Sequence, residues 1–564
     1  MVVLLISLVT GFVFIPLLGN CPLFDWDEIN FAECAREMLI TGDYGRVQLN
    51  FQPFWEKPPF FIWLQALSMN IFGVNEFAAR FPNAVCSIAT VLVLYSAGSK
   101  FHSRNFGLLW SLMYIALMLP HLYFRSGIID PWFNLFIFYA VYRLILITNN
   151  PNSASELKGA FIGGVSLGLA VLTKGPAALI VVGLTVLFVL TLLKLFHVLR
   201  SRTYLVFMIT CLLVSLSWFI GEWLNGNSDV IQEFITYQSR LFNTGDAGHD
   251  GPIYYHVLVL LLGCFPASLI FIRSYTNKQD LTHFQLLFRR FMVALFWVVL
   301  ILFSIVKTKI VHYSSLCYFP LTFMAVLGLM QYLPQLKLKG ILRSAYWLIT
   351  SLIALALILI CALPLYKDAL LRSNLITDSF AKGNLQAEVN WSGMEAIVVP
   401  IFLLASFLFY KGVQKAKLNK IVYALMTFLI FISITIAMII PRVEMYTQHS
   451  AIAFYKACAK HDCYVETHGY KSYAYLFYSD RRPEHHIHPG QIAYIKKFID
   501  ERAGAGKIRS VFYANAYCNW MKYEKIDKAG YIVCKINDEG PMQDDSFYRK
   551  LYELNGYSFW GRIH

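Results

Sequence analysis

Trp347–Leu365 reads WLITSLIALALILICALPL, a stretch without a single charged side chain. An α-helix needs about 20 mainly apolar residues to cross the hydrocarbon core of a bilayer, so this stretch predicts a membrane-spanning helix. Phe161–Leu172 and Ala178–Leu195 are similarly apolar and almost free of charge. Runs of this kind recur along the chain, and they predict an all-α polytopic membrane protein.

The overall composition agrees with this fold class. Of the 564 residues, 57% are hydrophobic and only 15% are charged, which is too apolar for an ordinary soluble protein. The net charge of +14 does not indicate nucleic acid as a partner, because lysine and arginine collect in the cytoplasmic loops of membrane proteins. We therefore expect membrane lipids, and no nucleic acid, among the partners.

Hydropathy predicts about thirteen spans in a membrane domain of residues 1–440, centred near residues 11, 87, 113, 139, 166, 187, 214, 263, 297, 322, 353, 403 and 430. Every second loop is basic, from the loop with Lys100 and Arg104 to the loop with Lys411 and Lys420. Because basic loops stay in the cytoplasm, this alternation predicts a cytoplasmic amino terminus and a carboxyl-terminal tail on the opposite side. The first apolar run lacks the features of a cleaved signal peptide, so we expect a retained span.

Residues 441–564 have the pattern of a soluble domain. Short apolar runs at 463–465, 509–513 and 531–534 predict strands, and 491–502 predicts an amphipathic helix. We expect this tail to form a small extracytoplasmic α/β domain.

The first outward loop, residues 20–60, holds the densest polar cluster. It contains Asp25-Trp26-Asp27-Glu28 and, about thirty residues later, Phe54-Trp55-Glu56-Lys57-Pro58-Pro59. Polar groups beside a span are costly unless they face water or a site, so the cluster predicts function. The spacing of residues 27–38 predicts a helix on the membrane surface, with Glu33 and Glu37 turned toward water.

Several motifs occur in a recognisable order. They are DEINFAECAREMLITGDYG (27–45), FWEKPPFFIWLQAL (54–67), FGVNEFAARFPNAV (72–85), LTKGP (172–176), GHDGP (248–252), and Phe303-Ser304 with Lys307-Thr308-Lys309. This order resembles the bacterial aminoarabinose lipid A transferases and their protein O-mannosyltransferase relatives, which have the GT-C fold. The resemblance covers most of the membrane portion and is weak in the tail.

The resemblance implies an inverting glycosyltransferase of the bacterial inner membrane that takes a sugar from a polyprenyl phosphate donor. The acceptor, on the periplasmic side, is either lipid A or a serine or threonine of an exported protein. A lipid A phosphate is already anionic and needs little base catalysis, whereas a hydroxyl needs a carboxylate base. Residues 236–242 and Asp250 depart from the pattern of the aminoarabinose transferases, which weakens aminoarabinose as the sugar.

A lipid-linked sugar flippase remains an alternative of a different class. Such transporters tend to show internal repeats and charges buried at the bilayer midplane. In this chain the charges gather in the outer loops and no repeat is visible, which favours the enzyme.

The resemblance also implies roles for individual residues. Asp27, Glu28 and Asp130 are the candidate catalytic residues, with Asp27 as base or acceptor-orienting group and Asp130 positioning the acceptor. Asp27 and Asp130 have an alternative as helix caps. Positive charge and hydrogen-bond donors stabilise a leaving phosphate, and the candidates for that role are Lys57, Lys174, Arg240, Lys309 and Tyr313. Their alternative is an interfacial position in which the side chain only reaches the headgroups.

Glu56 and His249 resemble a pair that holds a divalent metal ion near the donor phosphate. Carboxylate and imidazole suit zinc or manganese. A polar contact without metal is the alternative for this pair, and we expect no organic cofactor.

Overall fold

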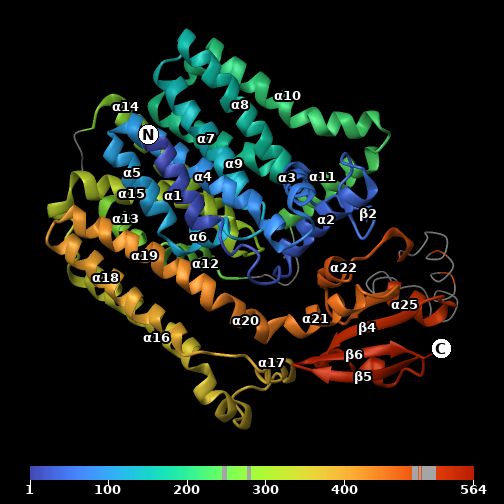
Figure 1. The fold of residues 1–564 in the computed structure, drawn as a ribbon. Helices are drawn as coiled ribbons and strands as arrows, with labels where there is room; N and C mark the ends of the chain where they lie inside the picture. The colour runs from blue at the N-terminus through green and yellow to red at the C-terminus, as the bar shows by residue number, and fades with distance from the viewer. Residues whose placement is uncertain (244–250, 276–280, 486–492, 494–496, 498–515, 564) are drawn as a thin grey trace.

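The computed structural model describes residues 1–563 with the exception of 244–250, 276–280, 486–492, 494–496 and 498–515. The chain forms a large bundle of helices with a small sheet at one end (Figure 1). The bundle contains α1 (Val2–Phe14), α2 (Asp27–Thr41), α3 (Phe60–Phe72), α4 (Glu76–Phe101), α5 (Arg104–Ile115), α6 (Met118–Phe124), α7 (Asp130–Asn149), α8 (Ala154–Lys174), α9 (Ala177–Leu193), α10 (Arg202–Leu224), α11 (Ser228–Asn243), α12 (Tyr255–Gly263), α13 (Ala267–Tyr275), α14 (His283–Ile305), α15 (Tyr318–Gln331), α16 (Gly340–Arg372), α17 (Ser379–Leu385), α18 (Val398–Gln414) and α19 (Leu418–Met438).

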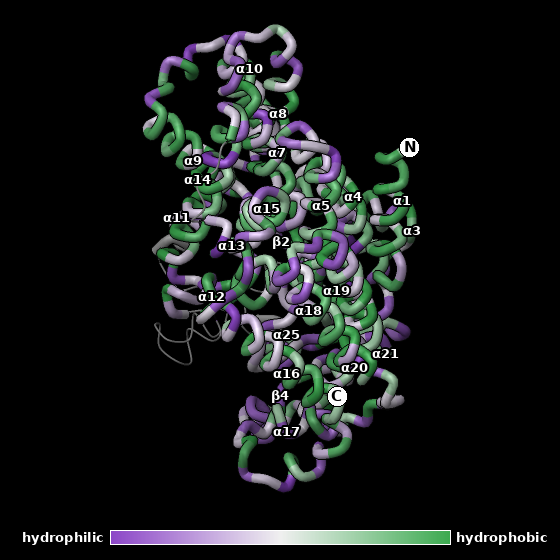
Figure 2. Tube along the Cα trace, turned by 90° about the vertical axis from the view of Figure 1, so that its left-hand side faces the viewer, coloured by the Kyte–Doolittle hydropathy of each residue, from purple (hydrophilic) through white to green (hydrophobic). Residues whose placement is uncertain are grey.

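The helices confirm a multi-pass, all-α membrane protein. Among the described residues, nine helical segments are long and apolar enough to cross a membrane, and the bent pairs α5–α6 and α12–α13 raise the number to 11. The shorter apolar helices α1 and α9 lie at the two remaining predicted centres. Figure 2 shows that hydrophobic segments dominate the bundle, and leucines of α16 such as Leu348, Leu352 and Leu355 are more than half exposed, as lipid-facing side chains are.

One apolar helix of the bundle was not among the predicted spans. The 13 residues of α3 extend over about 20 Å, which is shorter than the ~30 Å hydrocarbon core of a bilayer. It packs against α2 and α4 and directly follows Pro58-Pro59. It therefore fixes the end of the first outward loop to the bundle.

The tail forms a four-stranded mixed sheet with the strand order β3-β4-β6-β5. β3 and β4 pair in parallel, whereas β6 is antiparallel to both β4 and β5. The predicted strands 463–465 and 531–534 lie within β3 and β4, while 509–513 and most of 491–502 fall outside the described residues. The elements are α20 (Ile440–Thr447), α21 (His449–Cys458), β3 (Cys463–His468), α22 (Ala474–Tyr478), α25 (Ala516–Tyr523), β4 (Ala529–Lys535), α26 (Gly540–Gln543), β5 (Tyr548–Leu554) and β6 (Tyr557–Arg562).

The β5–β6 hairpin was absent from the predicted elements. Its strands are joined by Asn555 and Gly556, whose φ angles are 50° and 83°. Two residues with positive φ make the tight turn that matches the twist of a hairpin, and Asn-Gly is the sequence that most favours it. The dipeptide was therefore the signal that could have predicted both strands.

The first outward loop and the tail share one hydrophobic core. Ile29 and Met38 of α2 pack in the same cluster as Tyr455 of α21, Tyr475 of α22 and Phe559 of β6. Figure 1 shows α2 and α22 on the same side of the bundle, where the tail begins. The tail is therefore packed on the loop and does not stand apart from the membrane domain.

The prediction that the acids of α2 face water was wrong. Glu33 and Glu37 are both fully buried. Glu33 pairs with Arg36 through two bonds of 2.7 and 2.8 Å, and Glu37 accepts the backbone N–H groups of Asn50 and Phe51. Those two residues turn the chain between the short strands β1 (Gln48–Leu49) and β2 (Gln52–Pro53). Because each carboxylate has specific partners, its burial is tolerated.

Candidate functional site

A cavity of about 770 Å³ lies between the helical bundle and the tail. Its apolar wall comes from α14, α19 and α20, with Phe303, Ile436 and Ile440 among the lining residues. Its polar wall contains six of the ten residues that the sequence analysis singled out: Asp27, Glu28, Glu56, Lys57, Lys174 and Tyr313. Motifs that are up to about 290 residues apart in the sequence thus meet in one place.

The centre of the polar wall is a row of titratable side chains, Lys174, Asp130, His312 and Asp27. Lys174 Nζ lies 2.6 Å from Asp130 Oδ1, and His312 Nε2 lies 3.8 Å from Asp130 Oδ2 and 3.7 Å from Asp27 Oδ2. Lys174 also lies over the ring of Tyr313, 5.0 Å from its centroid. Asp130 is buried, whereas the Asp27 side chain is 38% exposed. Asp27 is thus the carboxylate of this row that a substrate can reach.

Neither aspartate caps its own helix. Asp27 begins α2 and Asp130 begins α7, but no side chain caps the amino end of either helix. The capping alternative is therefore not supported by the geometry. The position of Lys174 depends on Gly175, whose φ is +88° and where a Cβ atom would lie 2.9 Å from the Phe234 ring.

Glu56 and Lys57 form a second polar group beside this row. The hydroxyl of Tyr237 in α11 donates to Glu56 Oε2 at 3.1 Å, and Lys57 Nζ lies 5.1 Å from the centroid of the Tyr237 ring. The next residues, Pro58 and Pro59, restrict the backbone that carries both side chains. Burial lowers the pKa of Lys57, although Glu56 and Asp27 nearby oppose this effect.

Glu28 has a structural role in this geometry, in contrast to the predicted catalytic one. Its two oxygens accept from Arg80 Nε and Nη2, both at 2.8 Å, and from the backbone N–H groups of Phe24 and Gly127. Burial disfavours the ionised Glu28, but Arg80 and these donors outweigh it, so the pKa is lowered. Since both oxygens are occupied, Glu28 has no free lone pair directed at a substrate.

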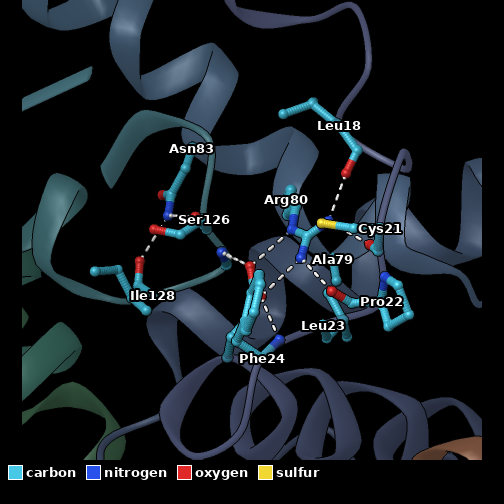
Figure 3. Close-up of polar contacts among 12 residues, drawn as sticks. Leu18, Cys21, Pro22, Leu23, Phe24, Ala79, Arg80, Asn83, Ser126 and Ile128 are labelled. Carbon is cyan, nitrogen blue, oxygen red and sulfur yellow. Dashed lines mark hydrogen bonds and ion pairs between the residues drawn. The ribbon is translucent and has the colours of Figure 1, made fainter. Parts of the chain in front are cut away.

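Arg80 joins the start of the first outward loop to α4. Figure 3 shows its guanidinium pointing toward the loop, where it donates to the carbonyls of Leu18, Cys21 and Pro22 at 2.7–2.9 Å. Asn83, one turn further along α4, donates to the carbonyls of Ser126 and Ile128. These bonds fix the loop that carries Asp27 and the loop that precedes Asp130.

Three predicted residues are not brought into the described site. Lys309 is 6% exposed, and its ammonium donates to the carbonyls of Phe303, Ser304 and Val306 at the end of α14. It therefore caps that helix and does not line the cavity. Arg240 lies in α11, but its side chain is outside the described part. His249 is outside the described residues altogether.

A metal ion is not supported by the side chains that the structure describes. Within those residues no group of three histidine, cysteine, aspartate or glutamate side chains is arranged to hold an ion. Glu56 offers one carboxylate, which accepts the Tyr237 hydroxyl.

Sequence reasoning missed two residues of the cavity. His312 directly precedes the candidate residue Tyr313, and this adjacency is the one feature of the sequence that could have indicated a role for it. Lys471 comes from the tail and lines the same cavity. Its ammonium lies 4.4 Å from the centroid of the Trp26 ring, a contact between residues 445 positions apart that no local pattern encodes.

Comparisons with known proteins agree with this arrangement. Residues 56–219 match the sequence profile of the dolichyl-phosphate-mannose-protein mannosyltransferases. Undecaprenyl phosphate-α-4-amino-4-deoxy-L-arabinose arabinosyl transferases are similar over longer stretches. The one from Shewanella sediminis is 26% identical over 63% of this chain, and the one from Photorhabdus laumondii is 28% identical over 55%. These alignments span 65% and 56% of the two relatives, which is less than two thirds of their length.

The solved structures extend the likeness to the whole fold. The crystal structure of ArnT from Cupriavidus metallidurans bound to undecaprenyl phosphate superposes with a TM-score of 0.73, at 15% sequence identity, over 100% of this chain and 98% of that one. The apo state of the same protein gives a TM-score of 0.74. These results show that the chain has the fold of ArnT, and that its sequence is similar to those of the arabinosyl transferases and, over residues 56–219, to the mannosyltransferase profile.

Proposed function

We propose that this protein transfers a sugar from a polyprenyl phosphate to an acceptor at the outer face of the bacterial inner membrane. The observation that carries the proposal is the cavity in which Lys57, Lys174 and Asp27 meet between apolar helices and the tail. An apolar wall suits a polyprenyl chain, and two lysines suit its phosphate. The similarity to the arabinosyl transferases and to the mannosyltransferases supports the same donor class.

The reaction requires the acceptor oxygen to attack the anomeric carbon while the bond between that carbon and the phosphate oxygen breaks. The electron pair of that bond leaves with the polyprenyl phosphate. Lys57 and Lys174 stabilise the charge that grows on this phosphate, and they do so best where water is excluded. The centroid of the Tyr313 ring lies 5.0 Å from the Lys174 ammonium, and the ring favours its positive charge at this place.

Asp27 either takes the proton of the acceptor or orients it, because its carboxylate is the exposed one in the central row. Asp130 binds Lys174, and His312, which also lines the cavity, lies within 4 Å of both Asp27 and Asp130. We propose lipid A as the acceptor, by analogy with the arabinosyl transferases. A serine or threonine of an exported protein is the second candidate, which the mannosyltransferase match supports.

The orientation belongs to the same proposal. The basic alternate loops support a cytoplasmic amino terminus and a periplasmic tail. The donor lipid would then enter from the bilayer, and the acceptor would approach from the side of the tail.

A divalent metal held by Glu56 and His249 also stays a proposal. Its test is the zinc and manganese content of the purified wild type, of Glu56→Gln and of His249→Ala.

The function is tested by transfer in membranes from cells that express the wild type, Asp27→Ala or the control Glu388→Gln. Glu388 is an exposed acid outside the cavity. Undecaprenyl phosphate carrying a radiolabelled sugar, either aminoarabinose or mannose, is supplied, and the products are separated into lipid A, protein and free lipid. Label in lipid A with the wild type and Glu388→Gln, but not with Asp27→Ala, supports the proposal. Label in protein selects the second acceptor, and label in neither overturns the transferase.

A further inference from the structure

The cavity is lined by five cationic side chains, and most of them already have a partner. Arg80 is bound to Glu28, and Lys174 is bound to Asp130. Arg125 donates to the backbone carbonyls of Val13 and Pro16. Among the described residues, the other two, Lys57 and Lys471, have no carboxylate within ion-pair distance.

Lys57 and Lys471 come from different parts of the chain. Lys57 belongs to the loop before α3 and faces Tyr237 of α11. Lys471 belongs to the turn between β3 and α22 in the tail, and its side chain is exposed. A group-transfer reaction brings two partners to one cavity. The proposed function assigns Lys57 to the donor phosphate, so Lys471 is available to the other partner.

The Lys471 ammonium is held in place by its surroundings. It lies 4.4 Å from the centroid of the Trp26 ring and 5.3 Å from that of Tyr473, and the two rings meet edge to face. The backbone N–H of Tyr473 donates to Asp25 Oδ1 at 3.3 Å. This contact attaches the turn to the first outward loop. The ring faces attract the ammonium and restrict its position, and an ammonium has three N–H donors, so it can still donate to another acceptor.

We propose that Lys471 is an acceptor-binding residue that binds a phosphate group of the acceptor and so favours an anionic lipid over a neutral hydroxyl acceptor. This inference rests on the proposed function and names the substrate class of the second partner. An ammonium that is exposed, positioned and unpaired binds a phosphate with charge-assisted hydrogen bonds. Asp27, one residue beyond Trp26, then faces the same acceptor from the loop.

The proposal is tested with the purified full-length protein in nanodiscs. The variants are Lys471→Ala, Lys471→Arg and the control Lys460→Ala, an exposed lysine of the tail outside the cavity. The two probes are lipid A and the same lipid after removal of its phosphates. Binding of each probe is measured by native mass spectrometry, and transfer is measured with the labelled donor.

We expect Lys471→Ala to weaken binding of lipid A and to raise its KM about tenfold, the equivalent of one charge-assisted hydrogen bond. The kcat, the donor KM and binding of the dephosphorylated lipid should stay within about twofold of the wild type. Lys471→Arg should restore most of the affinity, and Lys460→Ala should behave as the wild type. If Lys471 had only a structural role, Lys471→Ala would weaken binding of lipid A and of the dephosphorylated lipid to the same extent.

Three results would overturn the proposal. One is unchanged binding and KM for lipid A in Lys471→Ala, and another is an effect on the donor KM instead. The third is a wild type that does not distinguish the two lipids. In each of these cases the proposed function still holds, provided that the wild type transfers sugar to an acceptor. If the wild type transfers sugar to no acceptor, the proposed function fails, and the assignment of Lys471 fails with it.

Discussion

His312 Nε2 lies 3.7 Å from Asp27 Oδ2 and 3.8 Å from Asp130 Oδ2, so one imidazole stands between two carboxylates that begin different helices. Asp27 is reached from the cavity, and Asp130 is buried against Lys174. The imidazole therefore lies between the exposed carboxylate of Asp27 and the buried carboxylate that binds Lys174.

Replacing Asp27 by Asn should lower kcat, because the amide keeps the shape of the side chain but cannot accept a proton. For a hydroxyl acceptor the expected loss is about 10²–10⁴-fold, as for general-base catalysis. His312→Gln should cost less, about tenfold, and should shift the pH profile, because a titratable imidazole beside both carboxylates is replaced by a neutral amide. Steady-state transfer at several pH values measures both. A flat pH profile identical to that of the wild type would exclude the role of His312.

The effects of Asp130→Asn and Lys174→Met on the free energy of unfolding should be strongly non-additive. Each single change leaves a charge in a poorly solvated place without its partner, which typically costs about 3–5 kcal/mol when the pair is buried. The double variant removes both charges and should be more stable than the sum of the single effects predicts. The double-mutant cycle is measured by thermal unfolding of the wild type, the two single variants and the double variant. If the two effects on stability simply add, the 2.6 Å contact between Lys174 and Asp130 contributes no coupling free energy.

Glu28→Gln should destabilise the protein and leave the chemistry of the folded fraction within about twofold. The reason is that Arg80, 5% exposed, would lose a buried carboxylate partner. Lys456→Met is the matched control, because it breaks an exposed contact with Glu76 that is worth about 0–1 kcal/mol. The measurements are Tm and kcat of the same preparations. If kcat fell strongly in Glu28→Gln at full stability, Glu28 would be catalytic after all.

Arg36→Met should loosen the tail from the first outward loop. Arg36 binds Glu33 of its own helix and reaches Asp480 and the carbonyl of Arg481 in the tail. Its side chain is 2% exposed, so these contacts are poorly screened by water. Limited proteolysis should then cleave the tail faster.

Arg482→Met is the control for this change, because Arg482 contacts the same Asp480 from an exposed position. We expect its cleavage rate to equal that of the wild type. Equal rates in all three proteins would mean that the hydrophobic cluster alone holds the tail.

The stability of the junction between loop and tail should depend on Asp25. Packing of the loop against the tail partly desolvates Asp25, although the residue stays exposed, and this raises its pKa to about 6; hydrogen bonds from Ser472 and Tyr473 only partly oppose the shift. In the unfolded chain the pKa is near 4. Between about pH 4 and pH 6 the folded state therefore binds more protons, and its stability falls as the pH rises.

The side chain in the Asp25→Asn variant carries no charge at any pH, so this variant does not lose stability as the pH rises. Its Tm relative to the wild type should rise between pH 4 and pH 7. A difference that stays constant over this range would show that Asp25 titrates normally.

The sequence by itself determined the class of fold and much of the polar wall. Apolar runs predict spans because a bilayer requires a continuous hydrophobic length, and this requirement acts locally along the chain. Asp27, Glu56, Lys57 and Lys174 were found because they stand in polar motifs beside such runs. The tail strands β3 and β4 were found for a similar reason, since their apolar residues are consecutive.

Only the tertiary structure decided which of these polar groups face the cavity. Glu28 and Asp27 are neighbours in the sequence, yet Arg80, from a helix 52 residues further on, binds Glu28, whereas Asp27 stays accessible. Lys309 resembled a phosphate ligand until its contacts with helix-end carbonyls were visible. Lys471 meets Trp26 across 445 residues of sequence. Such pairings depend on long-range packing, because burial and charge partners are set by elements that local patterns do not bring together.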